Sequence, residues 1–90
     1  MSSHFHLKIV TPTEVFFDAD VESLTAPGEE GYFGVLVNHA PFITRILPGR
    51  MTLRKTDGAP PAKFNISSGF FEISKNKAVL LAEKIEIGKV

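Results

Sequence analysis

The sequence of 90 residues contains no cysteine and no tryptophan, and neither sign of charge is in excess. The absence of cysteine excludes disulfide scaffolds, thiolate zinc sites and cysteine nucleophiles. Ten basic residues balance ten acidic ones, whereas a nucleic-acid-binding protein needs a basic surface that displaces counterions. We therefore expect no nucleic-acid partner.

Long apolar runs and targeting signals are also missing. No stretch approaches the ~20 apolar residues that span a bilayer. The N-terminal residues show no basic segment followed by an apolar run, which is the pattern of a signal peptide. We expect no direct membrane insertion, so any association with a membrane would depend on a partner protein.

The residues that are present form an ordinary globular composition. Hydrophobic residues make up 43% and charged residues 22% of the chain, and eight phenylalanines supply much of the volume for a core. A chain of this length makes one domain, which we expect over residues 1–90 with a core at about residues 4–84.

Apolar and polar residues alternate in short segments that turn residues separate. Phe5, Leu7 and Ile9, for example, alternate with polar side chains, which is typical of a strand with one buried face. Similar segments follow at residues 15–17, 21–26, 32–37, 42–47, 51–54, 63–67 and 70–74. The pattern predicts an all-β sandwich or flattened barrel of roughly eight to ten short strands.

Two early segments are irregular. Asp18, Ala19 and Asp20 are predicted to turn the chain between residues 15–17 and the strand that follows. Alternation within residues 21–26 is imperfect, which favours a bulge or a strong twist there.

The C-terminal segment is ambiguous from its pattern alone. Several apolar residues of segment 77–87 fall at helical spacing, and the segment is rich in helix formers. A tight turn predicted at Lys75 and Asn76 favours a strand instead, with Leu80 and Leu81 buried on both faces.

The three histidines do not form a recognisable site. His4 and His6 are two residues apart on one strand face, but a stable metal site needs further ligands, so we interpret them as part of an exposed polar face. His39 lies in a predicted turn, where a hydrogen bond that fixes the turn is favoured over catalysis. We predict no metal and no catalytic residue.

Other candidates for chemistry are equally weak. The chain has no glycine-serine-glycine elbow and no phosphate-binding glycine loop. Asp18 and Asp20 are paired carboxylates that we interpret as a solvated turn. Glu29 and Glu30 form either a solvated loop tip or a contact for basic groups of a partner, and the residues alone do not decide between the two.

The segment 28–44 reads Gly-Glu-Glu-Gly-Tyr-Phe-Gly-Val-Leu-Val-Asn-His-Ala-Pro-Phe-Ile-Thr, and Leu-Pro-Gly follows at residues 47–49. This order closely resembles the epsilon subunit of rotary F-type ATP synthases, with its acidic Gly-x-x-Gly turn, Gly-His-Ala-Pro, threonine and Pro-Gly. Residues 7–12, 67–73 and 77–83 resemble its opening strand, Ser-Gly-Gly segment and last strand. The resemblance covers nearly the whole chain.

The resemblance implies a flattened ten-stranded β-sandwich and a non-catalytic subunit without a cofactor. Such a subunit belongs to the rotor stalk, where it docks gamma to the c-ring and couples proton-driven rotation to ATP synthesis and hydrogen-ion transport. It implies a peripheral location at the cytoplasmic face of a bacterial inner membrane. The alternative is a small-ligand- or carbohydrate-binding β-domain.

Residues of this chain that match the family motifs fall into two groups. The candidate gamma interface comprises Thr11, His39, Pro41, Phe42 and Thr44. The candidate c-ring interface comprises Glu29, Glu30, Gly31 and Tyr32. Asn38 departs from the family's usual glycine before histidine, but asparagine also tolerates a left-handed backbone, so we expect the turn to survive.

The family usually continues into a C-terminal helical hairpin, which inhibits ATP hydrolysis and in some members helps to bind ATP. This sequence ends at Val90, before such a hairpin. The chain is either a naturally short epsilon or a domain excised from a longer one. If the short form is natural, the resemblance implies no hairpin inhibition, and we expect no ATP binding by the isolated chain. The resemblance also implies a strand over residues 77–83 and a short trailing segment over residues 84–90.

Overall fold

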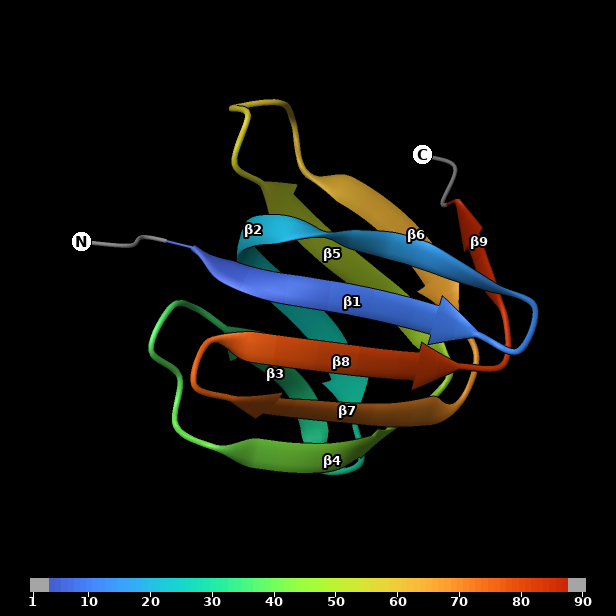
Figure 1. The fold of residues 1–90 in the computed structure, drawn as a ribbon. Coiled ribbons are helices and arrows are strands. Elements are labelled where there is room, and N and C mark those ends of the chain that lie inside the picture. Colours follow the sequence, from blue (N-terminus) through green and yellow to red (C-terminus); the bar gives the residue numbers. More distant parts are fainter. Residues whose placement is uncertain (1–3, 88–90) are drawn as a thin grey trace.

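Nine β-strands and no helix are found in residues 4–87, the part of the chain that the computed structural model describes (Figure 1). The strands are β1 (Phe5–Thr11), β2 (Glu14–Gly28), β3 (Gly31–Val35), β4 (Phe42–Ile46), β5 (Gly49–Lys55), β6 (Ala62–Ile66), β7 (Gly69–Ser74), β8 (Lys77–Ala82) and β9 (Ile85–Ile87). Their order in the sheet is β1-β8-β7-β4-β2-β5-β6-β9, and β3 pairs with β2. The prediction of an all-β fold is confirmed.

The long strand β2 belongs to both layers of the fold. Its first half pairs with β1, from Thr11 opposite Glu14 to Phe5 opposite Val21, and its second half pairs with β3 and β5. In Figure 1, β1, β8, β7 and β4 lie in front of β3, β5 and β6. A single pair, Gly28 with Ile46, joins β4 to the end of β2 and closes the two layers.

The expected turn at Asp18–Asp20 is wrong, because these residues continue β2. Asp18 lies opposite Lys8 and Asp20 opposite His6, so each carboxylate faces a basic residue across the ladder. Such cross-strand pairs stabilise a sheet. One strand therefore replaces two predicted ones, and residues 4–87 hold nine strands where the resemblance implied ten. The predicted irregularity is confirmed by a register shift between Val21 and Ser23.

The ambiguous C-terminal segment forms strand β8, as the turn at Lys75 and Asn76 predicted. Both turn residues have positive φ, 52° and 60°, as a two-residue hairpin of type I′ requires. The expectation that Leu81 is buried is wrong, because the alternation of β8 turns it outward and leaves it 47% exposed.

Residues 84–90 were expected to form a short trailing segment, and this prediction is wrong for residues 85–87. These residues form β9, which pairs with β6 and satisfies backbone groups that an edge strand would leave open. Residues 88–90 of that expectation lie outside the described part of the chain.

The core lies between the two layers and follows the alternation of the strands. Phe5, Leu7 and Ile9 of β1 are fully buried, as predicted from their spacing. Phe33 contacts Phe42 and Phe71 with ring centroids 5.3 and 5.2 Å apart, so aromatic side chains connect the back layer to the front. The remaining fully buried large residues are Val21, Leu24, Val35, Ile46, Met51, Leu53, Ile73 and Leu80.

Gly69 packs closely against the backbone of the neighbouring strand β8. A Cβ atom added at Gly69 would lie 1.8 Å from the carbonyl oxygen of Leu81 on the neighbouring strand. Because backbone atoms would have to move, Gly69→Ala should lower the free energy of unfolding by about 3 kcal/mol, measured by urea denaturation.

The matched control for this prediction is Gly34→Ala, because a Cβ atom added at Gly34 would lie 4.0 Å from its nearest neighbour, the Leu24 carbonyl oxygen. We expect this variant to change stability by no more than about 0.5 kcal/mol. Equal stability of the two variants would contradict the packing described for Gly69.

Candidate interaction surfaces

The acidic residues predicted as a partner contact form the tip of the β2–β3 hairpin. Gly28 lies opposite Gly31, so Glu29 and Glu30 are the two residues of the loop, and both are exposed. Gly31 has φ 117°, a conformation that side chains disfavour. The glycines therefore fold a tight tip that presents two carboxylates to solvent.

The base of this tip is attached to β4. The Glu29 N–H donates to the carbonyl oxygen of Arg45 at 3.1 Å, and the Arg45 side chain lies 3.8 Å from the Glu29 carboxylate. Both charged side chains are exposed, so this ion pair contributes little stability and mainly orients the tip. Tyr32 is 62% exposed, and its hydroxyl oxygen accepts a hydrogen bond from the Arg50 N–H at 3.3 Å.

The structure brings residues of both predicted interfaces into one hollow. This hollow has a volume of about 300 Å³. Phe42 and Thr44, predicted for the gamma interface, line it together with the acidic tip. Its remaining lining residues are Gly28, Glu29, Glu30, Gly31, Tyr32, Phe33 and Ile43. The two predicted groups therefore adjoin each other along the start of β4.

His39 lies in the loop of residues 36–41, which connects β3 to β4. Its ring Nδ1 hydrogen bonds the Ala40 carbonyl oxygen at 2.7 Å, and its backbone N–H donates to the Leu36 carbonyl oxygen at 3.3 Å. The prediction of a hydrogen bond that fixes this turn is confirmed. The centre of the His39 ring also lies 5.6 Å from the centre of the Phe42 ring, so His39 packs against the first residue of β4. Pro41 is exposed beside them.

Asn38 stands where the ATP synthase epsilon subunits usually have a glycine, and the turn expected at this position is present. Its φ of 64° lies in the left-handed region, as expected from the tolerance of asparagine. Its backbone N–H donates to Oδ1 of Asn76 at 2.6 Å, and the Asn76 amide donates to Oδ1 of Asn38 at 2.9 Å. The contact between Asn38 and Asn76 could not be predicted from local sequence patterns, because the two residues are far apart along the chain.

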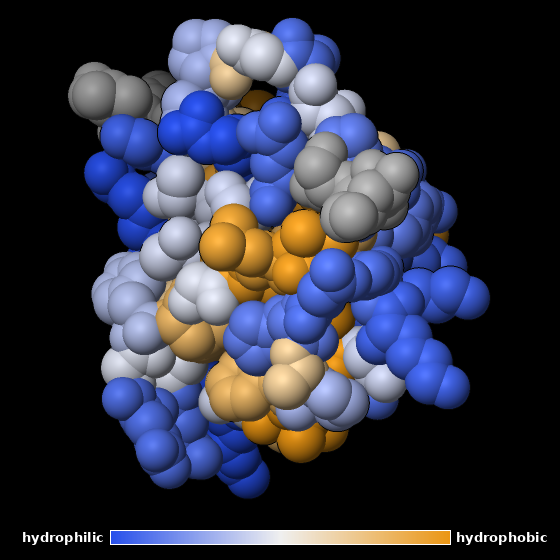
Figure 2. Space-filling model, turned by 90° about the vertical axis from the view of Figure 1, so that its left-hand side faces the viewer, coloured by the Kyte–Doolittle hydropathy of each residue, from blue (hydrophilic) through white to orange (hydrophobic). Residues whose placement is uncertain are grey.

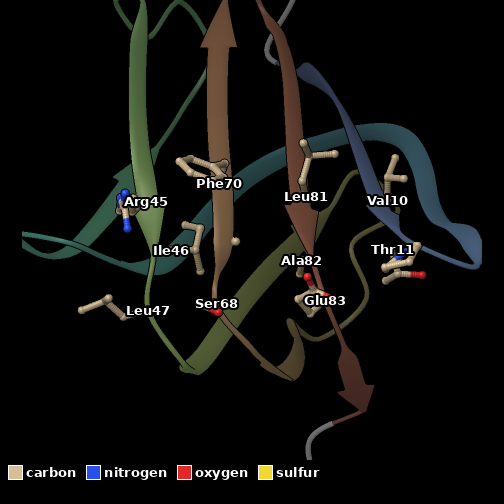
Figure 3. A pocket seen from close by; sticks show the side chains of 12 residues that line it. Val10, Thr11, Arg45, Ile46, Leu47, Ser68, Phe70, Leu81, Ala82 and Glu83 are labelled. Carbon is tan, nitrogen blue, oxygen red and sulfur yellow. The ribbon is translucent and has the colours of Figure 1, made fainter.

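Thr11 lies apart from the other residues predicted for the gamma interface. It ends β1, which is separated from β4 by β8 and β7 in the sheet. Thr11 lines a groove of about 480 Å³ on the outside of the front layer (Figure 3). The groove is lined by Val10, Thr11, Pro12, Arg45, Ile46, Leu47, Ser68, Gly69, Phe70, Leu81, Ala82 and Glu83.

Sequence reasoning missed this groove, although the pairs of adjacent apolar residues carried a signal. In a strand, one member of such a pair must face outward: Phe70 is 51% exposed beside the buried Phe71. Register places Phe70 next to Arg45 and Leu81, and Figure 3 shows these side chains in one row across neighbouring strands. The Arg45 guanidinium lies 5.7 Å from the centre of the Phe70 ring.

A cluster of charged residues crosses the β1–β2 ladder. His6 contacts Asp20 through Nδ1 at 2.9 Å and Asp18 through Nε2 at 2.5 Å. A neutral imidazole has only one N–H, so both contacts are hydrogen bonds only when His6 is protonated. The bond to Asp20, and then the bond to Asp18, raises the pKa of His6 above its ordinary value of 6.5. The face predicted to be exposed and polar is therefore exposed at His6, where His6 forms a cluster of ion pairs with Asp18 and Asp20.

Within residues 4–87, no three side chains of His, Asp or Glu are arranged to hold a metal ion. The same part of the chain contains no helix long and apolar enough to cross a membrane.

The fold is that of a small β-sandwich domain. The sequence profile of the family described as "ATP synthase, Delta/Epsilon chain, beta-sandwich domain" matches residues 4–88, and the chain belongs to this family. An ATP synthase epsilon chain of Chlorobaculum tepidum is 43% identical over 90% of this chain and 91% of its own length. An ATP synthase epsilon chain of Desulfatibacillum aliphaticivorans is 40% identical over 96% of this chain but only 60% of its own.

Solved structures share the fold at low sequence identity. A chain of the Euglena gracilis mitochondrial ATP synthase, solved with OSCP, F1 and the c-ring, matches with a TM-score of 0.89 at 19% identity, over 97% of this chain and 55% of that chain. A chain from the central stalk and c-ring of the Tetrahymena thermophila enzyme matches with a TM-score of 0.75 at 15% identity, over 89% and 63%. The resemblance read from the sequence is confirmed at the level of the family and the fold.

The His6 cluster predicts a pH-dependent stability. Because the pKa of His6 is raised in the folded state, its contribution is fully present below the ordinary value of 6.5 and is lost as the pH rises through the folded-state pKa. The urea midpoint should therefore fall as the pH rises from below 6.5 through the raised pKa of His6 in the folded state.

His6→Gln should flatten this decline, and so should the double change Asp18→Asn with Asp20→Asn. His39→Gln is the control, because the His39 ring hydrogen bonds a backbone carbonyl. A His6→Gln variant that keeps the full wild-type decline would show that another group causes it.

Proposed function

We propose that this chain is a non-catalytic subunit of the central rotor stalk of an F-type ATP synthase, which docks the gamma subunit to the c-ring and so couples proton-driven rotation to ATP synthesis. Membership of the delta/epsilon family and relatives named ATP synthase epsilon chain support this function. The fold is shared with chains solved in F1/c-ring and central stalk/c-ring assemblies. These findings favour the rotor subunit over a small-ligand- or carbohydrate-binding domain.

The c-ring contact is assigned to the tip of the β2–β3 hairpin. The observation that carries this assignment is the pair of exposed carboxylates, Glu29 and Glu30, on a two-residue loop bounded by Gly28 and Gly31. The bond from Glu29 to the Arg45 carbonyl sets the direction in which the tip projects. Carboxylates at such a tip suit basic or polar loops of a ring, and they contribute mainly orientation and rate of association.

The gamma contact is assigned to the loop of residues 36–41 and the start of β4. This segment combines the exposed Pro41 with the His39 and Phe42 rings, a mixed apolar and polar surface typical of protein interfaces. Figure 2 views this end of the molecule and shows apolar side chains gathered at its centre with hydrophilic ones around them. A patch of this kind is typical of an interaction site.

Thr11 extends the proposed gamma surface only if the partner also reaches the groove of the front layer. Arg45 lines that groove and also pairs with Glu29 beside the hollow, so it links the two regions. We propose a peripheral location at the cytoplasmic face of a bacterial inner membrane, which follows from assembly with the ring.

Charge reversal at the tip tests the ring contact. The double change Glu29→Lys and Glu30→Lys should reduce co-purification with a gamma–c-ring complex by about tenfold at low salt, because unfavourable charge slows association. Glu86→Lys on β9 is the control, since Glu86 is exposed far from the hairpin in the sheet order. Equal loss in both variants would contradict the assignment.

A charge placed in the apolar surface tests the gamma contact. Pro41→Asp should weaken binding to isolated gamma by about tenfold or more, because the carboxylate loses water without gaining a partner. Lys63→Asp on β6 is the control at an exposed position of the other layer. Failure of the wild-type chain to bind gamma in calorimetry would overturn the proposed function itself.

A further inference from the structure

A reciprocal pair of amides joins two turns that lie far apart in the sequence. Asn76 accepts the Asn38 N–H at Oδ1 and donates its side-chain amide to Oδ1 of Asn38, at 2.6 and 2.9 Å. Figure 1 shows the loop of residues 36–41 beside the β7–β8 turn at the same end of the molecule. We propose that this amide pair holds the loop in a preformed docking conformation and that Asn38 and Asn76 are positioning residues for it.

The loop depends on this pair because its other hydrogen bonds are internal. The bonds described for residues 36–41 join His39 to Leu36 and His39 to Ala40, and neither reaches another part of the fold. Asn76 is the hydrogen-bonding partner of the loop that lies outside it in the described structure. Loss of the pair would leave the loop held by packing of His39 on Phe42 and by its two ends.

Asn76 itself is firmly anchored. It occupies the type I′ turn between β7 and β8, where Lys75 and Asn76 both have positive φ. Its carbonyl oxygen also accepts the backbone N–H of His6 at 2.9 Å, which ties the turn to β1. The side chain of Asn76 therefore reaches the loop from a position fixed by three strands of the front layer.

Part of the loop surface is apolar, so holding the loop in place favours docking. Leu36 is 62% exposed and Pro41 is also exposed, so the loop presents apolar groups to water without burying them. A loop ordered before it meets its partner pays less entropy on binding than one that orders afterwards. This inference rests on the proposed function, since the partner is the gamma subunit.

Glycine substitutions separate the amide pair from the turns. Asn76→Gly keeps the positive φ of the hairpin turn and removes both hydrogen bonds, whereas Lys75→Gly changes the neighbouring turn residue and leaves the pair intact. Asn38→Asp keeps the side-chain acceptor and a residue that tolerates the left-handed backbone.

The first measurement is solvent exchange of the Asn38 amide proton by NMR on the full chain. We expect Asn76→Gly to speed exchange of this proton about fivefold, because the Asn38 N–H loses the one hydrogen bond that it donates, to Oδ1 of Asn76. Lys75→Gly and Asn38→Asp should exchange like the wild type. Unchanged exchange in Asn76→Gly would overturn the proposal that the pair orders the loop.

The second measurement is the association rate with isolated gamma, together with the urea midpoint of each variant. We expect Asn76→Gly to slow association or weaken affinity for gamma about fivefold. Lys75→Gly should bind gamma like the wild type when its urea midpoint matches that of Asn76→Gly. Faster amide exchange with unchanged gamma binding would overturn the positioning role. A wild-type chain that does not bind gamma would overturn the proposed function and this role, while amide exchange would still decide whether the pair orders the loop.

Discussion

The passage of strand β2 from one layer to the other is the constraint on which the rest of the structure depends. Its first half completes the front layer with β1 and its second half starts the back layer with β3 and β5. The register shift between Val21 and Ser23 marks the place where its pairing with β5 becomes irregular. Because both layers share one strand, the core between them can close in a chain of 90 residues without disulfides. The acidic hairpin tip lies at the end of the same strand.

Strand β4 brings the proposed interfaces together. Phe42, Ile43 and Thr44 at its start line the hollow beside the acidic tip. Arg45 near its end, and Leu47 just after it, line the groove on the outside of the front layer. The backbone of Arg45 holds the tip, while its guanidinium lies over Phe70. A partner on β4 would therefore adjoin a partner on the tip.

Much of the fold could be predicted from the sequence, because period-two alternation reports directly which side chains face the core. Phe5, Leu7 and Ile9 are buried as their spacing predicted. Errors arose where charged residues continue a strand, as at Asp18 and Asp20, because their stabilising partners lie on another strand and are invisible to local propensity. The burial predicted for Leu81 failed for a related reason, since a doublet of leucines does not reveal that one face of β8 is open to solvent.

The shape of the predicted segments could be read from the sequence, but their arrangement in space could not. The glycines around Glu29 and Glu30 signalled a tight exposed tip, which the structure contains. The shared hollow, the separation of Thr11 and the contact between Asn38 and Asn76 depend on strand order, which local sequence patterns do not encode. These three features determine which residues a single partner could contact.

Site-specific disulfide cross-linking in an assembled complex tests the central claim most directly, because the chain has no cysteine of its own. Glu30→Cys should cross-link to cysteines placed in the polar loops of the c-ring, and Pro41→Cys to cysteines placed in gamma. Each should leave the other partner unlinked. Cross-linking of both positions to the same subunit, or to neither while Glu86→Cys on β9 links, would contradict the claim that the hairpin tip meets the ring and the loop of residues 36–41 meets gamma.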